Sequence, residues 1–164
     1  MTESNQGSGE QSQEQPSQQF VLQKVYLKDV SFETPNSPEI FTEKWEPTVN
    51  IELKTNGKAL AAEVHEVVLG ITVTAKVGEK VAYLVEVHQA GVFGVSGFSE
   101  SDMGPLLGSY CPNLLFPFAR EAISDLVTKG GFPQLLLQPV NFDAIYQDHI
   151  RQANQEPVQE NPVH

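Results

Sequence analysis

Apolar and polar residues alternate along several stretches in the first half of this chain. Successive side chains of a β-strand point to opposite faces, so each such stretch predicts a strand with one buried face and one exposed face. The expected strands cover residues 23–33, 49–54, 64–76 and 81–87. Asn56-Gly57 is expected to end the second strand, and Val77-Gly78-Glu79 is short enough for a hairpin turn between the third and the fourth.

Three prolines, Pro35, Pro38 and Pro47, lie between the first and second expected strands. Proline lacks a backbone N–H group and fixes φ, so this region cannot join a regular strand. We therefore expect a long crossover loop, which carries Phe41 and Trp45. A long connection of this kind is typical of a Greek key, and the pattern predicts a four-stranded antiparallel Greek-key sheet.

The second half of the chain has the longer period of a helix. Between residues 113 and 129 the polar side chains recur on one helical face and the apolar ones on the opposite face. We expect Pro117 in the first turn of this helix and Gly130 at its end. Shorter helices are expected near 101–107 and 143–152. Strands followed by helices indicate an α+β fold with helices packed on one face of the sheet.

The two ends of the chain are polar. Residues 1–19 contain three Glu and no Lys or Arg, and residues 152–164 contain two Pro and two Glu. Such segments bury too little apolar surface to offset the entropy lost on ordering. We expect two disordered tails around a single domain at 20–151.

Charge and composition exclude several classes of function. The net charge of −11 disfavours nucleic acid and anionic membrane surfaces, because both require basic residues. No apolar stretch approaches the roughly 20 residues that span a bilayer, so we expect no membrane insertion. Met1-Thr2-Glu3-Ser4 lacks the features of a secretory signal, and the one cysteine fits a reducing compartment. A cytoplasmic protein is expected.

No residue pattern points to catalysis. The four histidines lie far apart and none pairs with a cysteine at metal-ligand spacing. Cys111 would need a neighbouring histidine to act as a nucleophile, and a buried cysteine is favoured. Gly91, Gly94 and Gly97 lack the following helix and the Gly-Lys-Ser/Thr of a phosphate loop, so they indicate a bulge or a close backbone approach. We expect no enzyme activity, no metal and no cofactor.

Six short segments, taken in order, resemble the bacterial protein-export chaperone family SecB. They are 26–33 (YLKDVSFE), 35–38 (PNSP), 45–47 (WEP), 110–117 (YCPNLLFP), 131–135 (GFPQL) and 139–144 (PVNFDA). The resemblance covers about residues 20–152.

The resemblance implies a cytosolic holdase that binds unfolded precursor polypeptides without ATP and delivers them to the SecA translocation motor. It also implies a homotetramer, a dimer of dimers with helices held between two sheets. An alternative on the same fold is a chaperone dedicated to a toxin–antitoxin pair or to another single client.

The family also implies roles for individual residues. Acidic residues on the outer sheet face meet a basic, zinc-bearing tail of SecA, and the matching positions here are Asp29, Glu33, Leu84 and Glu86. The alternation supports this, because Asp29 and Glu33 share one face of the first strand and Leu84 and Glu86 share one face of the fourth. The zinc belongs to the partner.

Client binding requires exposed apolar surface rimmed by charge. Its candidates are the apolar residues of the crossover loop, of the second strand and of the segment before the last helix. They are Phe41, Trp45, Val49, Ile51, Leu53, Leu135, Leu136, Leu137 and Phe142. The same residues would also fit a core or an interface.

The opposite face of the fourth strand is expected at the tetramer interface. Val85 and Val87 match family positions at or near the contact between dimers. Apolar side chains suit the centre of an obligate interface better than acids do.

Overall fold

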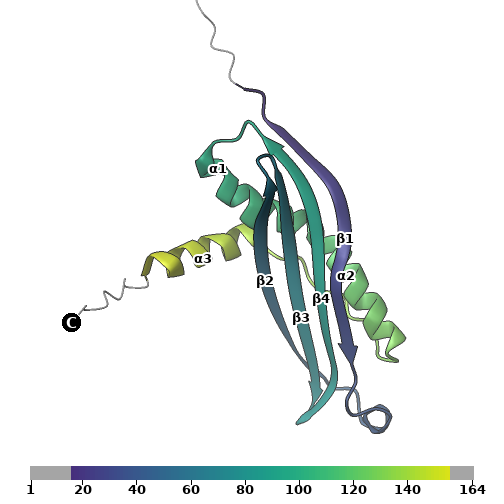
Figure 1. Ribbon diagram of the computed structural model, residues 1–164. Coiled ribbons are helices and arrows are strands. Elements are labelled where there is room, and N and C mark those ends of the chain that lie inside the picture. Colours follow the sequence, from purple (N-terminus) through teal and green to yellow (C-terminus); the bar gives the residue numbers. More distant parts are fainter. Residues whose placement is uncertain (1–15, 156–164) are drawn as a thin grey trace, which may run out of the picture.

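The computed structural model describes residues 16–155, whose strands form one antiparallel sheet (Figure 1). The strands are β1 (Gln19–Glu33), β2 (Thr48–Ala61), β3 (Val64–Val77) and β4 (Lys80–Ser96). Their spatial order is β1-β4-β3-β2. The long loop after β1 leads to β2 at the opposite edge, and the consecutive strands β2, β3 and β4 bring β4 beside β1, so the expected Greek-key sheet is confirmed. The loop contains one short 3-10 helix, η1 (Glu39–Thr42).

Three strand boundaries lie well outside the expected ranges, because β1 starts at Gln19, β2 ends at Ala61 and β4 ends at Ser96. β2 continues through Asn56-Gly57 to Ala61, so the prediction that these residues end the strand is wrong. Gly57 pairs with Val67 of β3, and Asn56 with Val68, so the ladder continues past both residues. The expected turn between β3 and β4 is confirmed at Gly78, whose φ of 60° is accessible to glycine without strain.

The side-chain alternation of β1 is interrupted twice. Its pairing with β4 contains two register shifts, one between Leu22 and Lys24 and one between Leu27 and Asp29. Each shift is a β-bulge, which reverses the side on which the following side chains point. Tyr26 therefore lies on the opposite face from Val30, whereas simple alternation places both on one face.

The helices follow the sheet, as expected. The first is α1 (Glu100–Pro105), which continues as the π-helical turn η2 (Leu106–Tyr110) into α2 (Cys111–Lys129). Because α2 starts at Cys111, Pro117 lies inside the helix and not in its first turn. The expected stop at Gly130 is confirmed, since α2 ends at Lys129 and the Gly130 N–H still donates to the Leu126 carbonyl at 2.8 Å.

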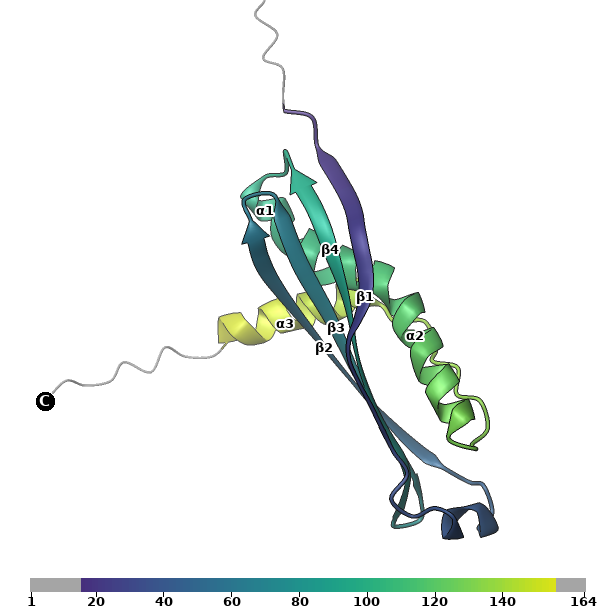
Figure 2. The same cartoon turned by 45° about the vertical axis from the view of Figure 1, so that its right-hand side comes forward.

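The last helix, α3 (Phe142–Gln155), extends away from the sheet (Figure 2). It is longer than expected and includes residues 152–155, which the sequence assigned to a disordered tail. Gln19, also assigned to a tail, is the first residue of β1. Residues 16–18 are described and have no regular secondary structure, and the other parts of both predicted tails, 1–15 and 156–164, lie outside the described residues. None of the described helices is long and apolar enough to cross a membrane.

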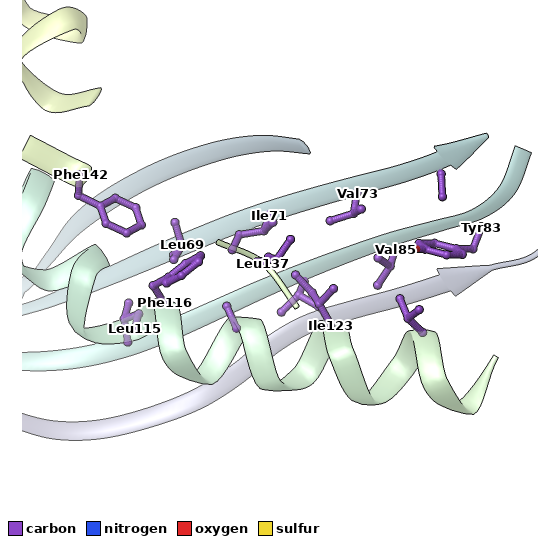
Figure 3. Packing of buried hydrophobic residues seen from close by; sticks show 14 of the residues in the cluster. Leu69, Ile71, Val73, Tyr83, Val85, Leu115, Phe116, Ile123, Leu137 and Phe142 are labelled. Atoms are coloured by element: carbon purple, nitrogen blue, oxygen red, sulfur yellow. The ribbon is translucent and has the colours of Figure 1, made fainter. Parts of the chain in front are cut away.

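The core lies between the sheet and α2. Figure 3 shows the side chains of α2 pointing toward those of β3 and β4. Odd-numbered residues of both strands supply the sheet side of this core, from Val67 to Ala75 in β3 and from Tyr83 to Val87 in β4. Even-numbered residues of β3 and β4 therefore point to the opposite face of the sheet, which we call the outer face.

Val85 and Val87 belong to this core. Both side chains are 0% exposed in the single chain. A side chain enclosed by its own protomer offers no exposed surface to a second copy, so the place of both valines at or near the contact between dimers stays a prediction. The alternation predicted the correct face of β4, but α2 covers that face.

Candidate functional site

An apolar groove follows the edge strand β2 on the helix side of the sheet. Val49, Ile51 and Leu53 pair with buried residues of β3, so they point to the same side as the core. Residues 135–140, between α2 and α3, form the other wall, and the groove encloses about 430 Å³. Ile51 is 42% exposed and Leu136 is 60% exposed. We call this the β2 groove.

A second groove adjoins the first. Residues 53–57 of β2 line one side, and Phe142, Ile145, Tyr146 and His149 of α3 line the other, together with Leu107 and Gly108 of η2. This α3 groove encloses about 480 Å³ and shares Leu53 with the β2 groove. Together they follow β2 from residue 49 to residue 57, a path of about 26 Å at roughly 3.3 Å per residue.

The backbone edge of β2 that faces away from β3 lies along the same path. Among the described strands β2 pairs only with β3, so its other edge has no strand beside it. Such an edge presents N–H and C=O groups that pair with an extended chain of any sequence. The site thus combines apolar walls with a main-chain edge.

Aromatic side chains gather beyond the crossover loop. The Phe132 ring lies 5.1 Å from the Phe41 ring, 5.5 Å from the Trp45 ring and 5.0 Å from the Tyr83 ring, measured between centroids. Phe32 also stacks on Tyr83, with 6.1 Å between the ring centroids. We call these five residues the aromatic cluster. Half of the Phe41 surface is exposed to solvent, and a smaller fraction of the Trp45 surface is exposed.

The structure separates the predicted client-binding residues into exposed and buried sets. The exposed or partly exposed set lies in the β2 groove and the aromatic cluster, and it comprises Phe41, Trp45, Val49, Ile51, Leu53, Leu135 and Leu136. Leu137 and Phe142 are only 4% and 5% exposed and pack mainly in the core, so their role as client contacts stays a prediction. Each retains only a small exposed part that borders a groove.

Sequence reasoning missed the α3 groove. Phe142, Ile145, Tyr146 and His149 recur at the spacing of one helical face, and this pattern was the available signal. Its polar rim, Lys54 and His149, lies at positions that carry no recognisable motif.

The structure brings the four predicted acidic-face residues together. Glu33 pairs with Leu84, and Asp29 pairs with His88, with Glu86 in the row between them. All lie on the outer face, away from α2. His88 Nε2 lies 2.7 Å from the Glu86 carboxylate. The carboxylates of Asp29, Glu33 and Glu86 therefore make one acidic area on three successive rows of β1 and β4.

Neither cysteine nor metal chemistry is supported. Cys111 is fully buried, and this burial raises the pKa of its thiol to about 12, so almost no thiolate forms at neutral pH. Among residues 16–155 no cluster of three or more His, Cys, Asp or Glu side chains is arranged to hold a metal ion.

Comparison with known proteins identifies one family. The family described as preprotein translocase subunit SecB matches residues 11–153. A protein-export protein SecB from Methylococcus capsulatus is 59% identical over 143 residues, covering 87% of this chain and 92% of the relative. A protein of the same name from Nitrosococcus oceani is 58% identical over 150 residues, covering 90% of each chain.

One solved structure has a similar fold. It is a Mycobacterium tuberculosis SecB-like chaperone in complex with an antitoxin peptide, with a TM-score of 0.62. The similarity covers 74% of this chain and 90% of the other, at 15% sequence identity.

Proposed function

Since this chain belongs to the SecB family, we propose that it is an ATP-independent cytoplasmic holdase that binds unfolded precursor polypeptides and delivers them to SecA for export. The observation that carries this proposal is the joined β2 and α3 grooves beside an edge of β2 that no other described strand pairs with. Most extended segments of a folded protein are already paired in its own sheets, whereas an unfolded chain presents many unpaired ones.

The grooves supply binding energy in two forms. A large apolar side chain contributes about 1.5–3 kcal/mol when it is fully buried, so several partial burials offset the entropy that a client segment loses. The β2 edge adds main-chain hydrogen bonds that require no particular sequence. Because the protein binds the unfolded state alone, mass action holds the client unfolded.

The outer face supports the delivery step. Asp29, Glu33 and Glu86 form a carboxylate area that would attract a basic segment of SecA. This area lies on the opposite side of the sheet from the grooves, so a bound client leaves it accessible. Asp29→Lys or Glu86→Lys should weaken SecA binding and its salt dependence, while client binding persists. Unchanged SecA affinity in both variants would refute this docking site.

A different surface supports the proposed tetramer. The β1 edge has no neighbouring strand among the described residues, and it exposes Val21, Leu22 and Leu27. Between β1 and α2 lies an open depression of about 910 Å³, bordered by Phe118 and by polar residues of α2. We propose that the exposed contacts with other copies lie here, because Val85 and Val87 expose no surface of their own. The mass of the purified protein in solution tests this assembly.

The dedicated-client alternative has less support. The chaperone with an antitoxin peptide shares only the fold with this chain, whereas the export proteins share more than half of the aligned residues. Competition distinguishes the two functions: a general holdase releases one labelled client to many unrelated unfolded proteins, and a dedicated chaperone releases it to none of them.

Client binding is tested at the exposed part of the β2 groove. Ile51→Asn should weaken the binding of a denatured client about tenfold, since it removes roughly 1.4 kcal/mol of apolar contact. Leu60→Asn is the matched control, because Leu60 is an exposed leucine on the same strand that borders neither groove. Equal affinity of the two variants would refute the proposed groove.

A further inference from the structure

The crossover loop places its own aromatic side chains in the aromatic cluster. Phe41 packs on Phe132, and Trp45 packs on both Phe132 and Tyr83. An aromatic side chain of an unfolded client would gain most by stacking on these same rings. In the client-free chain, residues 41–46 therefore occupy the surface that such a side chain needs. We call residues 41–46 the strap.

The strap is bounded by firm attachments on either side. Ile40 is 2% exposed and packs in the core, and Asn36 Nδ2 donates to the Val81 carbonyl at 2.9 Å. After the strap the chain enters β2 at Thr48. Movement of the strap is therefore confined to the residues between Ile40 and β2, and it leaves the sheet unchanged.

One ion pair joins the strap to the sheet. Lys80 Nζ, at the first residue of β4, lies 2.6 Å from Glu43 Oε1. The Glu43 carboxylate raises the pKa of Lys80. Every other polar contact of the strap within the described residues stays inside the crossover loop, including the Lys44–Glu46 pair at 2.9 Å. Aside from this ion pair, stacking holds the strap on the sheet, and hydrogen bonds from residues 41–43 to residues 38–40 hold its first part within the crossover loop.

We propose that the strap is an autoinhibitory element: it competes with aromatic segments of the client for the rings of Phe132 and Tyr83, and the Lys80–Glu43 ion pair sets how often it opens. This inference rests on the proposed holdase function. A client then binds with an apparent affinity reduced by the fraction of molecules in which the strap is open.

The size of the effect follows from the exposure of the pair. Both side chains are more than a third exposed, so water and salt screen their attraction. Exposed ion pairs of this kind change an equilibrium by about twofold to fivefold. Removal of the pair should raise the open fraction by that factor, and high salt should do the same in the unmodified protein.

Trp45 reports on the strap directly, because it is the only tryptophan in the chain. The test compares the quenching of its fluorescence by acrylamide in client-free Lys80→Gln and Lys44→Gln. Each variant loses one positive charge, but Lys44→Gln breaks only a contact inside the strap. We expect greater quenching of Trp45 in Lys80→Gln and no change in Lys44→Gln. Equal quenching in the two variants would overturn the proposed ion-pair control.

A second measurement tests the competition. The clients are two denatured peptides without tryptophan, one rich in Phe and Tyr and one in which Leu replaces every aromatic residue. Lys80→Gln should bind the aromatic peptide about twofold to fivefold more tightly and the leucine peptide with unchanged affinity. Weaker binding of the aromatic peptide would show that the strap clamps the client, and would overturn the proposal.

These readouts separate the inference from the function on which it rests. If the unmodified protein binds neither peptide, the holdase function is refuted, and competition by the strap is refuted with it. If the protein binds both peptides and Lys80→Gln binds them as the unmodified protein does, only the strap proposal is refuted.

Discussion

Tyr26 and Glu66 are joined by a hydrogen bond across the outer face, although they lie on β1 and β3 and β4 runs between these strands. Lys28 adds a second bond, with its Nζ 2.6 Å from the Glu66 carboxylate. Both β1 residues lie close to the bulge between Leu27 and Asp29. The Glu66 carboxylate therefore fixes the position of the β1 bulge, after which the β1 side chains point to the opposite sides of the sheet.

The Glu66 contacts predict a pH-dependent stability. Hydrogen bonds from Lys28 and Tyr26 lower the pKa of Glu66 below its ordinary value of 4.5. A lowered pKa in the folded state contributes stability that is complete above pH 4.5 and is lost as the pH falls through the folded-state pKa. Glu66→Gln should therefore lower the free energy of unfolding by about 1 kcal/mol at neutral pH and have little effect once the carboxylate is protonated.

Denaturant unfolding at neutral and acidic pH measures this difference. Glu52→Gln is the control, because Glu52 is an exposed carboxylate on the outer face with no ion pair among the described residues. A destabilisation by Glu66→Gln that stays constant down to strongly acidic pH would contradict the assigned role.

Val85 and Val87 should behave as core residues of the protomer. Truncation of either to Ala removes buried methyl groups and should lower the free energy of unfolding by about 2 kcal/mol. Val30→Ala is the control, since Val30 pairs with Val87 but is partly exposed. Unfolding and solution mass should be measured at several protein concentrations, because association also contributes to apparent stability. If Val87→Ala altered only the mass, the predicted interface role would be supported instead.

The sequence predicts the sheet well because its alternation reports burial directly. In β3 and β4 one face is covered by α2 and the other is open, so Val85 and Glu86 were assigned to the correct faces. The prediction fails where the backbone departs from a simple strand. The β1 bulges insert residues that alternation cannot reveal, and the ladder passes through Asn56-Gly57 because the pairing with β3 outweighs the local preference for a turn.

The site was predicted less completely, because apolar side chains of a groove and of a core look alike in a sequence. Leu136 and Leu137 are adjacent and chemically identical, yet one is 60% exposed and the other 4%. Their difference arises from how residues 135–140 pass between β2 and α2. That path depends on tertiary packing, which the local pattern of apolar residues in the sequence does not reveal.

The docking of α3 depends on Gly104 and Gly108. Both glycines lie against Tyr146, and a Cβ on Gly104 would collide with the Tyr146 hydroxyl. Gly104→Ala should therefore loosen α3, and its amide hydrogens should exchange faster with solvent. Tyr146→Phe removes the colliding oxygen, so the double variant should recover slow exchange. If the double variant exchanged as fast as Gly104→Ala, the hydroxyl contact would not be the cause.

Cys111 should be inert in the folded protein and should make it sensitive to alkali. Burial raises the pKa of the thiol from 9.0 to about 12. A raised pKa contributes stability that is complete below pH 9.0 and is lost as the pH rises toward 12, because the unfolded thiol ionises first. Cys111→Ala should therefore lose less stability than the unmodified protein over this range, as measured by denaturant unfolding at increasing pH.

At neutral pH an aromatic disulfide reagent should react with the thiol only after unfolding, and Cys111→Ala should still hold a denatured client. Rapid reaction of the native protein, or loss of client binding in Cys111→Ala, would show that the thiol is exposed or functional.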